Sequence, residues 1–398
     1  MRSPCGTKVG APQPSRPLRV LRVADVPGEH LGGVRLAITS TSARLADRGH
    51  LIDHRFSEDM PTPGPRRLRR LIVPLLLPLH IMNLKARGEA PDIVEVHEPL
   101  GAPYALVRRL TGRRLPPMVA HSQGLEELGW RAQKARWRLR GVRGPLKSRV
   151  LVPVTLIAQA KIATRLADGV FVVSSQDRDH LLEKGMSAGR VHRVDNGVEK
   201  DLLTLRRPPP ADDGSVLLLF VGTWIDRKGT PELVQAFARL CAHHPGVRLA
   251  VAGTGVPAAE VLSSVPESVR EKVEVHEFVA RHELRHLLGR ADVFVLPSWF
   301  EGMPLSLLEA AAAGLPIVAT DTCGIRDVLR PIDPDRDGGR LVPPNDGAAL
   351  HVALDELVRD ATVRRELGVR ARARAHAFTW AGSADALEHV YLASLDAR

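Results

Sequence analysis

Short apolar runs alternate with helix-forming segments along almost the whole chain, and the alternation restarts after residue 196. Runs such as LRVLRVADV (18–26) and SVLLLFVG (215–222) have the length and the continuous apolar character of strands that are covered on both faces. The pattern therefore predicts parallel sheets with helices packed on either side. Because it occurs twice, and because 398 residues exceed one ordinary core, we expect two α/β domains.

In the first half, the strand at 18–26 is followed by the glycine loop GEHLGG and by a helix expected over 34–48. Further strands of this sheet are expected at 91–97, 116–122 and 168–174. In the second half, helices are expected at 231–243 and 283–288, and strands at 215–222, 247–253, 273–278 and 292–298. The Pro-, Gly- and Asp-rich segment 196–215 separates the halves and is the best candidate for a linker.

The composition, 44% apolar and 25% charged residues, is that of a globular protein. No apolar run approaches the roughly 20 residues of a membrane-spanning helix. Residues 1–17 lack the apolar segment of a signal peptide, so we expect a disordered leader and a cytoplasmic protein. The three cysteines form no C-x-x-C pair, which argues against a disulfide framework and against a thiolate zinc site.

The net charge of +11 suggests a polyanionic partner, and the cationic residues cluster in two places. One cluster, Arg66, Arg67, Arg69 and Arg70, precedes the apolar segment 71–82, and the other runs through residues 130–149. A basic segment beside an apolar one suits an anionic membrane surface. The alternative is a buried helix with solvated flanks, because prolines at 74 and 78 interrupt a regular amphipathic helix. Nucleic acid is a poor candidate, with 4% aromatic residues and no recognised binding module.

The stretch WFEGMPLSLLEAAAAGLPIVAT (299–320) predicts a helix that begins at Pro304 and stops at Gly314. Its amino end, with the free N–H groups of Leu305 and Ser306, would follow directly after a strand and form an anion site. Glu301 before this end and Glu309 within the helix could accept hydroxyl groups on opposite sides of a bound phosphate. The alternative is that Glu301 only complements the helix dipole and that Glu309 is an ordinary surface residue.

The segment EGMPLSLLE, with two glutamates separated by seven residues, resembles the hallmark of the retaining, nucleotide-sugar-dependent glycosyltransferases of family 4, which have the GT-B fold. Further segments resemble this family in the same order: GEHLGG, PDIVEVHEPLG, ADGVFVVSS, VDNGVE, FVGTWIDRKG and AFTWAGSADALEHVY. The resemblance implies two doubly wound, Rossmann-like domains that face each other across a cleft, with a C-terminal helix crossing back to the first domain. The expected division is a leader at 1–17, an acceptor-side domain at 18–200, a linker at 201–214, a nucleotide-sugar-binding domain at 215–376 and a crossover helix at 377–398.

The resemblance also assigns roles to individual residues. It implies that Glu301 binds hydroxyl groups of the donor sugar and that Glu309 binds the ribose. The other donor-binding residues that it implies are Gly32, Gly33, Arg227, Lys228, Val279, Met303, Leu305 and Ser306. The glycines would let the backbone approach the diphosphate, and Val279 would meet the base through its backbone. No cofactor or bound metal is implied.

The chain departs from the family pattern at two positions. Thr223 stands where the family commonly has an arginine, whereas Lys228 matches, and Arg227 beside it could supply the missing charge; an exposed basic turn is the alternative. The family also has a histidine near the reacting carbon, and the most natural register puts Gln123 there and His121 two positions earlier. Either a small shift brings His121 into the catalytic site, or Gln123 acts only as a hydrogen-bond donor.

The loop PIDPDRDGG (331–339) imitates the first half of a calcium-binding loop through Asp333, Asp335 and Asp337. The twelfth position of such a loop requires a bidentate glutamate and is Pro344 here. We therefore expect a solvated loop and no metal site.

Together these features predict a retaining glycosyltransferase that moves a sugar from a nucleotide-sugar donor to an acceptor hydroxyl. The acceptor would enter through the first domain, and the basic segments suggest a glycolipid, a lipid-linked saccharide or another cell-envelope precursor at the cytoplasmic membrane face. The alternative is a catalytically weak nucleotide-binding or scaffold partner of another glycosyltransferase, which the departures at Thr223 and Gln123 would favour. The lack of G-x-G-x-x-G spacing in GEHLGG argues against a nicotinamide dehydrogenase. Base, sugar, acceptor and oligomeric state depend on loop shapes that one sequence does not specify.

Overall fold

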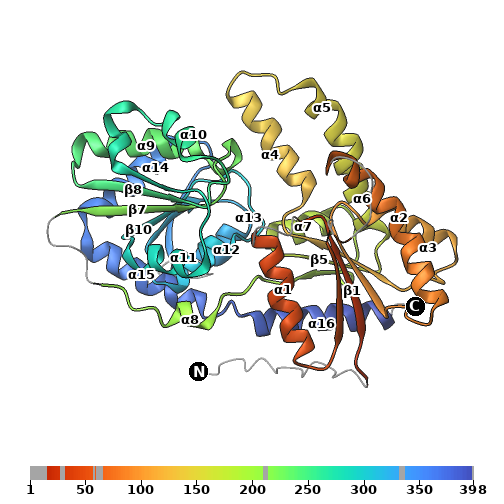
Figure 1. The fold of residues 1–398 in the computed structure, drawn as a ribbon. Coiled ribbons are helices and arrows are strands. Elements are labelled where there is room, and N and C mark those ends of the chain that lie inside the picture. Colours follow the sequence, from red (N-terminus) through yellow and green to blue (C-terminus); the bar gives the residue numbers. More distant parts are fainter. Residues whose placement is uncertain are drawn as a thin grey trace, which may run out of the picture.

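A computed structural model describes residues 16–26, 32–56, 59, 66–208, 214–330 and 337–396. The chain forms two six-stranded sheets in which all neighbouring strands are parallel, each covered by helices (Figure 1). This confirms the predicted fold class of two doubly wound domains.

The first sheet has the strand order β2-β1-β3-β4-β5-β6. Its strands are β1 (Arg19–Ala24), β2 (Leu51–Phe56), β3 (Ile93–His97), β4 (Met118–Ser122), β5 (Gly169–Val172) and β6 (Val191–Arg193). The second sheet has the order β12-β11-β10-β7-β8-β9. Its strands are β7 (Val216–Val221), β8 (Val247–Ala252), β9 (Val273–His276), β10 (Val293–Leu296), β11 (Ile317–Thr320) and β12 (Gly339–Val342).

All strands predicted from the sequence are present, but four others were not assigned. Three of these four, β2, β6 and β12, lie at sheet edges. An edge strand pairs on one side only, so it needs less apolar sequence than a central strand, and LIDHRF of β2 shows mostly exposed or half-buried positions. The fourth, β11, is interior and is only four residues long.

Helices of the first domain cover both faces of its sheet. They are α1 (Gly33–Ala46), α2 (Arg66–Ala86), α3 (Ala102–Leu110), α4 (Glu126–Leu139), α5 (Leu146–Val152), the π-helical turn η1 (Pro153–Ile157), α6 (Ala158–Leu166) and α7 (Ser175–Glu183). Helix α2 continues through Pro74 and Pro78, which corrects the expectation that these prolines spoil an amphipathic helix. Three buried side chains, Val73, Leu77 and Ile81, pack into the core and offset the backbone hydrogen bonds that proline removes.

The second domain contains the remaining helices and two short 3-10 turns. They are η2 (Asp226–Lys228), α9 (Thr230–His243), α10 (Ala258–Ser263), η3 (Glu267–Lys272), α11 (Arg281–Arg290), α12 (Leu305–Ala312), α13 (Cys323–Leu329), α14 (Gly347–Arg359) and α15 (Ala361–Ala375). The predicted linker 201–214 is not wholly extended, because its first residues belong to the short helix α8 (Lys200–Leu203).

The last helix, α16 (Trp380–Asp396), returns from the second domain and packs on the first (Figure 1). It contacts α1, β4 and β5, and Leu387 and Val390 join Val20 and Phe171 in one buried cluster. Residues 1–15 of the predicted leader lie outside the described part of the chain, whereas Arg16 forms an ion pair with Asp92 at 2.6 Å.

Candidate active site

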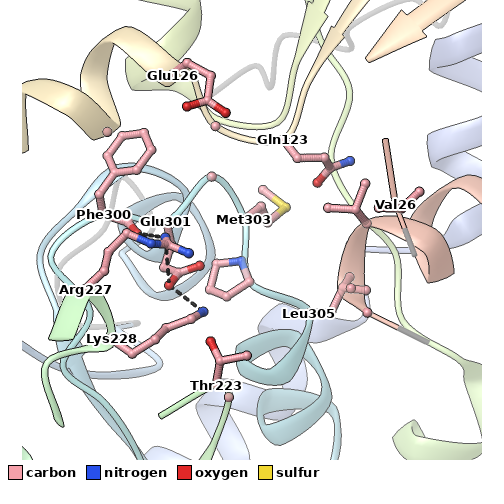
Figure 2. Close-up of a pocket in the computed structure, with 18 of the residues that line it drawn as sticks. Val26, Gln123, Glu126, Thr223, Arg227, Lys228, Phe300, Glu301, Met303 and Leu305 are labelled. Atoms are coloured by element: carbon pink, nitrogen blue, oxygen red, sulfur yellow. Dashed lines mark hydrogen bonds and ion pairs between the residues drawn. The ribbon is translucent and has the colours of Figure 1, made fainter. Parts of the chain in front are cut away.

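The two domains enclose a cleft of about 1140 Å³ that is lined by residues of both (Figure 2). Pockets for small ligands commonly measure about 300–1,000 Å³, so this cleft is at least as large as such pockets. The lining residues follow the carboxyl ends of β1, β3 and β4 in the first domain and of β7 and β10 in the second. Ligands of open α/β sheets bind at this edge.

Helix α12 points its amino end into the cleft. Pro304, Leu305 and Ser306 all line the cleft, so the positive end of the helix dipole faces the space where a ligand would lie. Pro304 is the N-cap residue, with φ −70° and ψ 125°, and the helix itself begins one position later than predicted. At the other end, Gly314 has φ +74°, which a residue with a side chain adopts only at a cost.

Glu301 lies before this helix and is surrounded by cations. Lys228 Nζ is 2.6 Å and Arg227 Nη1 is 3.7 Å from Glu301 Oε1, while the same Arg227 nitrogen donates a hydrogen bond to the Phe300 carbonyl at 2.9 Å (Figure 2). Burial alone would raise the pKa of Glu301, but Lys228 and Arg227 together outweigh burial and lower it below its usual value. Glu301 is therefore ionised at neutral pH and shares both cations with any phosphate bound there.

Glu309 lies one turn inside α12 and also faces the cleft. It is 8% exposed, which contradicts the alternative that it is an ordinary surface residue. Burial raises the pKa of Glu309 to about 7; Arg281, at 3.6 Å, opposes this rise, while Glu199 and Asp201 add to it. The two glutamates of EGMPLSLLE thus lie in the same cleft in different charge environments.

On the first-domain side, Gln123 and His121 both line the cleft, and His121 is buried. Gln123 Nε2 is 2.8 Å from His121 Nε2, and His121 Nδ1 is 3.0 Å from Glu95 Oε1. Because the amide nitrogen can only donate, His121 Nε2 accepts and Nδ1–H points at Glu95. Burial, aided by His97, lowers the pKa of His121 well below its usual value, so the ring is neutral at pH 7.

The amide oxygen of Gln123 connects to the second domain. Asn196 Nδ2 donates to Gln123 Oε1 at 3.0 Å and to the Met303 carbonyl at 2.9 Å. Both residues named in the two sequence alternatives therefore line the cleft, and the 2% exposed His121 accepts a hydrogen bond from the Gln123 amide. Asn196 was not singled out in the sequence, because its link to Met303 forms only across the domain boundary.

The other predicted donor-binding residues also lie along the cleft. Gly32 and Gly33 at the start of α1 line it, and Gly33 lies close to the Leu305 side chain; Val279, just before α11, also lines it. Thr223 follows β7 and lies near Lys228 in the view of Figure 2. The cleft therefore brings together every site residue named from the sequence.

Three side chains with metal-ligating atoms gather at the first-domain wall of the cleft, which two of them, His97 and His121, line. Atoms of Glu95, His97 and His121 lie within 4.8 Å of one another. Arg22 Nη2 is 2.9 Å from Glu95 Oε1, however, and the Tyr391 hydroxyl donates to the other carboxylate oxygen. A fully buried guanidinium already neutralises Glu95, so the group fits an ion-paired network better than a cation site. Residues 331–336 of the acidic loop lie outside the described residues.

A further carboxyl group lines the first-domain side of the cleft. Glu98 Oε2 accepts a hydrogen bond from the Ser122 hydroxyl at 3.0 Å. Burial raises the pKa of Glu98 to about 8, with the Ser122 hydrogen bond acting in the opposite direction. At neutral pH this group is mainly a neutral carboxylic acid, which can donate as well as accept hydrogen bonds.

Two facing domains with parallel sheets and a C-terminal helix that returns to the first domain define the GT-B class of folds. The solved structure of sucrose-phosphate synthase from Thermosynechococcus elongatus shares this fold, with a TM-score of 0.71 at 21% identity over 94% of this chain and 98% of that chain. The family model of Glycosyltransferase Family 4 matches residues 31–202, and that of Glycosyl transferases group 1 matches residues 203–374. The chain belongs to glycosyltransferase family 4.

Curated relatives carry several different activities in their names. Over 58% of this chain, the alpha-maltose-1-phosphate synthase of Mycolicibacterium smegmatis is 31% identical, and the match covers 64% of that protein. The D-inositol 3-phosphate glycosyltransferase of Geodermatophilus obscurus is 29% identical over 94% of this chain and 87% of its own length. The match spans only 55% to 64% of the length of four of the relatives.

Proposed function

We propose that this protein is a glycosyltransferase that moves a sugar from a nucleotide-sugar donor to an acceptor hydroxyl with retention of anomeric configuration. The observation that supports this most directly is the grouping of Arg227, Lys228 and the amino end of α12 around Glu301 in a cleft between two domains. Cations and a helix amino end suit a diphosphate, and a buried ionised carboxylate suits sugar hydroxyls. Of the relatives named above, one is named a D-inositol 3-phosphate glycosyltransferase and the other an alpha-maltose-1-phosphate synthase, and both names describe work on sugars or sugar phosphates.

The proposed reaction is a displacement on one face of the sugar. The bond between the anomeric carbon and the diphosphate oxygen breaks, and the acceptor oxygen forms a new bond to that carbon. The acceptor proton passes to the leaving phosphate, so the protein need not supply a base. This suits Gln123, whose amide cannot take up a proton at neutral pH and which can only orient groups at the cleft wall.

The charge that develops on the leaving diphosphate would be stabilised by Lys228, Arg227 and the α12 dipole. We propose that these groups suffice without a bound metal. Glu309, on the far side of the helix end from the sugar, would accept the ribose hydroxyls in its ionised form. Met303, Leu305 and Ser306 lie between the two glutamates and would line the diphosphate pocket.

Nucleotide binding tests the proposal first. We expect one of UDP, GDP and ADP to raise the melting temperature by several degrees, because a ligand at a hundred times its Kd stabilises the native state by about 2.7 kcal/mol. Lys228→Ala is expected to lose most of this shift, whereas Arg248→Ala, which removes an exposed cation of the same domain, should keep it. The measurement is differential scanning fluorimetry.

Three outcomes separate the candidate functions. Binding of one nucleotide, followed by transfer from one of its sugars, supports the enzyme. Binding without transfer or hydrolysis of any sugar of that nucleotide would favour a nucleotide-binding partner of another glycosyltransferase. If no nucleotide shifts the melting temperature, the donor site proposed here is wrong.

We further propose that the acceptor is a glycolipid or lipid-linked saccharide met at an anionic membrane surface. Within the part of the chain that the structure describes, no helix has the length and apolar character needed to cross a bilayer. Helix α2 exposes Leu75 (63%) and Leu79 (62%), while α5 and the turn after it expose Leu146 (72%) and Val154 (66%). Apolar side chains beside a basic segment are the features of a surface-binding element.

Vesicle binding tests this surface. Replacing Arg66, Arg67, Arg69 and Arg70 with glutamine is expected to reduce binding to phosphatidylcholine vesicles that contain phosphatidylglycerol by tenfold or more, because each basic residue contributes about 1 kcal/mol near an anionic surface. The matched control replaces four exposed arginines of the second domain, Arg248, Arg359, Arg365 and Arg370. Co-sedimentation with the vesicles measures the binding of both variants. Equal binding by the two variants would exclude the proposed surface.

A further inference from the structure

Arg136 belongs to α4 of the first domain, but its side chain is buried against the second domain. It is 1% exposed. Its guanidinium lies 2.7 Å from Asp226 Oδ1 and 2.7 Å from Glu232 Oε1, donates to the side-chain oxygen of Asn345, and stacks over the Trp299 ring with 3.0 Å between its central carbon and the ring centroid. All four partners belong to the second domain. Helix α4 lies on the side of the first domain that faces the second (Figure 1).

These partners adjoin the groups proposed to hold the donor. Asp226 immediately precedes Arg227 and Lys228 in η2. Trp299 donates its backbone N–H to the Arg227 carbonyl at 3.1 Å and precedes Glu301 by two residues. One arginine of the first domain therefore contacts both segments of the second domain that meet at the Lys228–Glu301 pair.

The chemistry of the contact requires an arginine. A planar guanidinium can bind two carboxylates with separate nitrogen atoms while its face lies on an indole ring, and a lysine ammonium cannot do this. Without Arg136, the carboxylates of Asp226 and Glu232 would place two negative charges next to the turn that is to receive a diphosphate. Arg140 approaches the same pair, at 3.0 Å from Asp226, but its side chain is 40% exposed.

We propose that Arg136 is a positioning residue that couples closure of the two domains to ordering of the diphosphate-binding turn Asp226–Lys228. When the first domain docks, its guanidinium neutralises Asp226 and Glu232 and fixes the turn and the Trp299 loop together. When the domains separate, the turn loses this support and the donor site loosens. Trp130, Gln133 and Trp137 of the same helix line the cleft, so an acceptor that contacts α4 would act on the donor site through the same residue. The inference rests on the proposed function, since it assigns a donor diphosphate to this turn.

The experiment compares the wild-type protein with Arg136→Ala, Arg136→Lys and a control, Arg131→Ala. Arg131 is an exposed arginine of the same helix and, among the residues that the structure describes, forms an ion pair only with Glu127 of that helix, at 2.6 Å. Calorimetry with whichever of UDP, GDP or ADP stabilises the wild-type protein should show a Kd at least tenfold weaker for Arg136→Ala. Arg136→Lys should recover little of this loss, and Arg131→Ala should bind as the wild-type protein does.

Hydrogen exchange supplies a readout that simple loss of stability would not reproduce. In the nucleotide complex, Arg136→Ala should exchange faster in the peptides that contain residues 222–233 and 297–304, with no change in α14 and α15 of the same domain. A double-mutant cycle with Glu232→Gln should be non-additive, because both changes break one interaction.

The outcomes distinguish the two proposals. A wild-type protein that binds no nucleotide contradicts the proposed function. If the wild-type protein binds a nucleotide but a folded Arg136→Ala variant has the same Kd and the same exchange, the role given to Arg136 is wrong. Should Arg136→Ala fail to fold, Glu232→Gln and Asp226→Asn test the contact from the second domain, and an unchanged Kd in both overturns the inference.

Discussion

Replacing Glu301 with glutamine is expected to lower sugar transfer by about 100-fold or more while nucleoside diphosphate binding stays equal or becomes tighter. The carboxylate lies 2.6 Å from Lys228 Nζ and repels any phosphate that approaches the same cation. Removing its charge frees Lys228 for the diphosphate but takes away the group proposed to orient the sugar. Misplacing a reacting group by about 1 Å can cost about 100-fold in rate.

Steady-state kinetics with the donor sugar, together with calorimetry on the free nucleoside diphosphate, measure the two effects separately. Glu260→Gln, an exposed glutamate of the same domain, is the control and should change neither. A Glu301→Gln variant that keeps more than a tenth of the wild-type transfer rate would show that Glu301 does not orient the donor sugar.

Nucleotide affinity is expected to rise with pH between 6 and 8 through Glu309. Its pKa is raised to about 7, so about a tenth of the protein carries the carboxylate at pH 6 and about nine tenths at pH 8. If only the ionised form accepts the ribose hydroxyls, this gives an increase of about tenfold. The phosphate groups titrate in the same range, so the comparison is with Glu309→Gln, which should bind weakly and lack this component. Calorimetry at three pH values measures the nucleotide Kd of the wild-type protein and of Glu309→Gln. If Kd changes with pH equally in the two proteins, the role of Glu309 is contradicted.

The same group makes the unliganded protein less stable as pH rises. The folded state holds the Glu309 proton up to a pKa of about 7, whereas the unfolded chain releases it near 4.5. Its stabilising contribution is therefore complete below pH 4.5 and is lost as pH rises to 7, at a cost of up to about 3 kcal/mol. The pKa of Glu98 is raised to about 8, so its ionisation also lowers the stability of the folded protein as pH rises. The contribution of Glu309 is therefore the difference in stability between the wild-type protein and Glu309→Gln. In urea unfolding, that variant should gain stability at pH 8 and gain little at pH 5.

The order of elements could be predicted from the sequence because each is encoded locally. Central parallel strands need continuous apolar runs, and helix ends carry glycine or proline. Short sequence segments were therefore enough to predict both domains and the position of α12. The edge strand β2 was not predicted because its alternating exposure has no strong apolar signal. The two prolines of α2 argue against a regular helix, but the helix forms because one of its faces packs against the core.

The sequence predicted which residues belong to the candidate site, but not how their side chains are arranged. How His121 and Gln123 share the first-domain wall of the cleft depends on the direction of each side chain at the end of β4. The signal available for Arg136 was a cluster of like charges, and nothing in that cluster separates a buried arginine from the exposed ones beside it.

By itself, the sequence determined the two α/β domains, the family and the positions of Glu301, Glu309 and Lys228, because backbone pattern and motif spacing are properties of neighbouring residues. Only the tertiary structure decided that Glu301 is ionised between two cations, that Glu309 has a pKa of about 7, and that Arg136 joins the domains. Burial and charge pairing depend on residues far apart in the chain: Arg136 and Asp226 are 90 positions apart, and Tyr391 meets Glu95 across 296. Such contacts exist only once the two domains and the returning helix are in place.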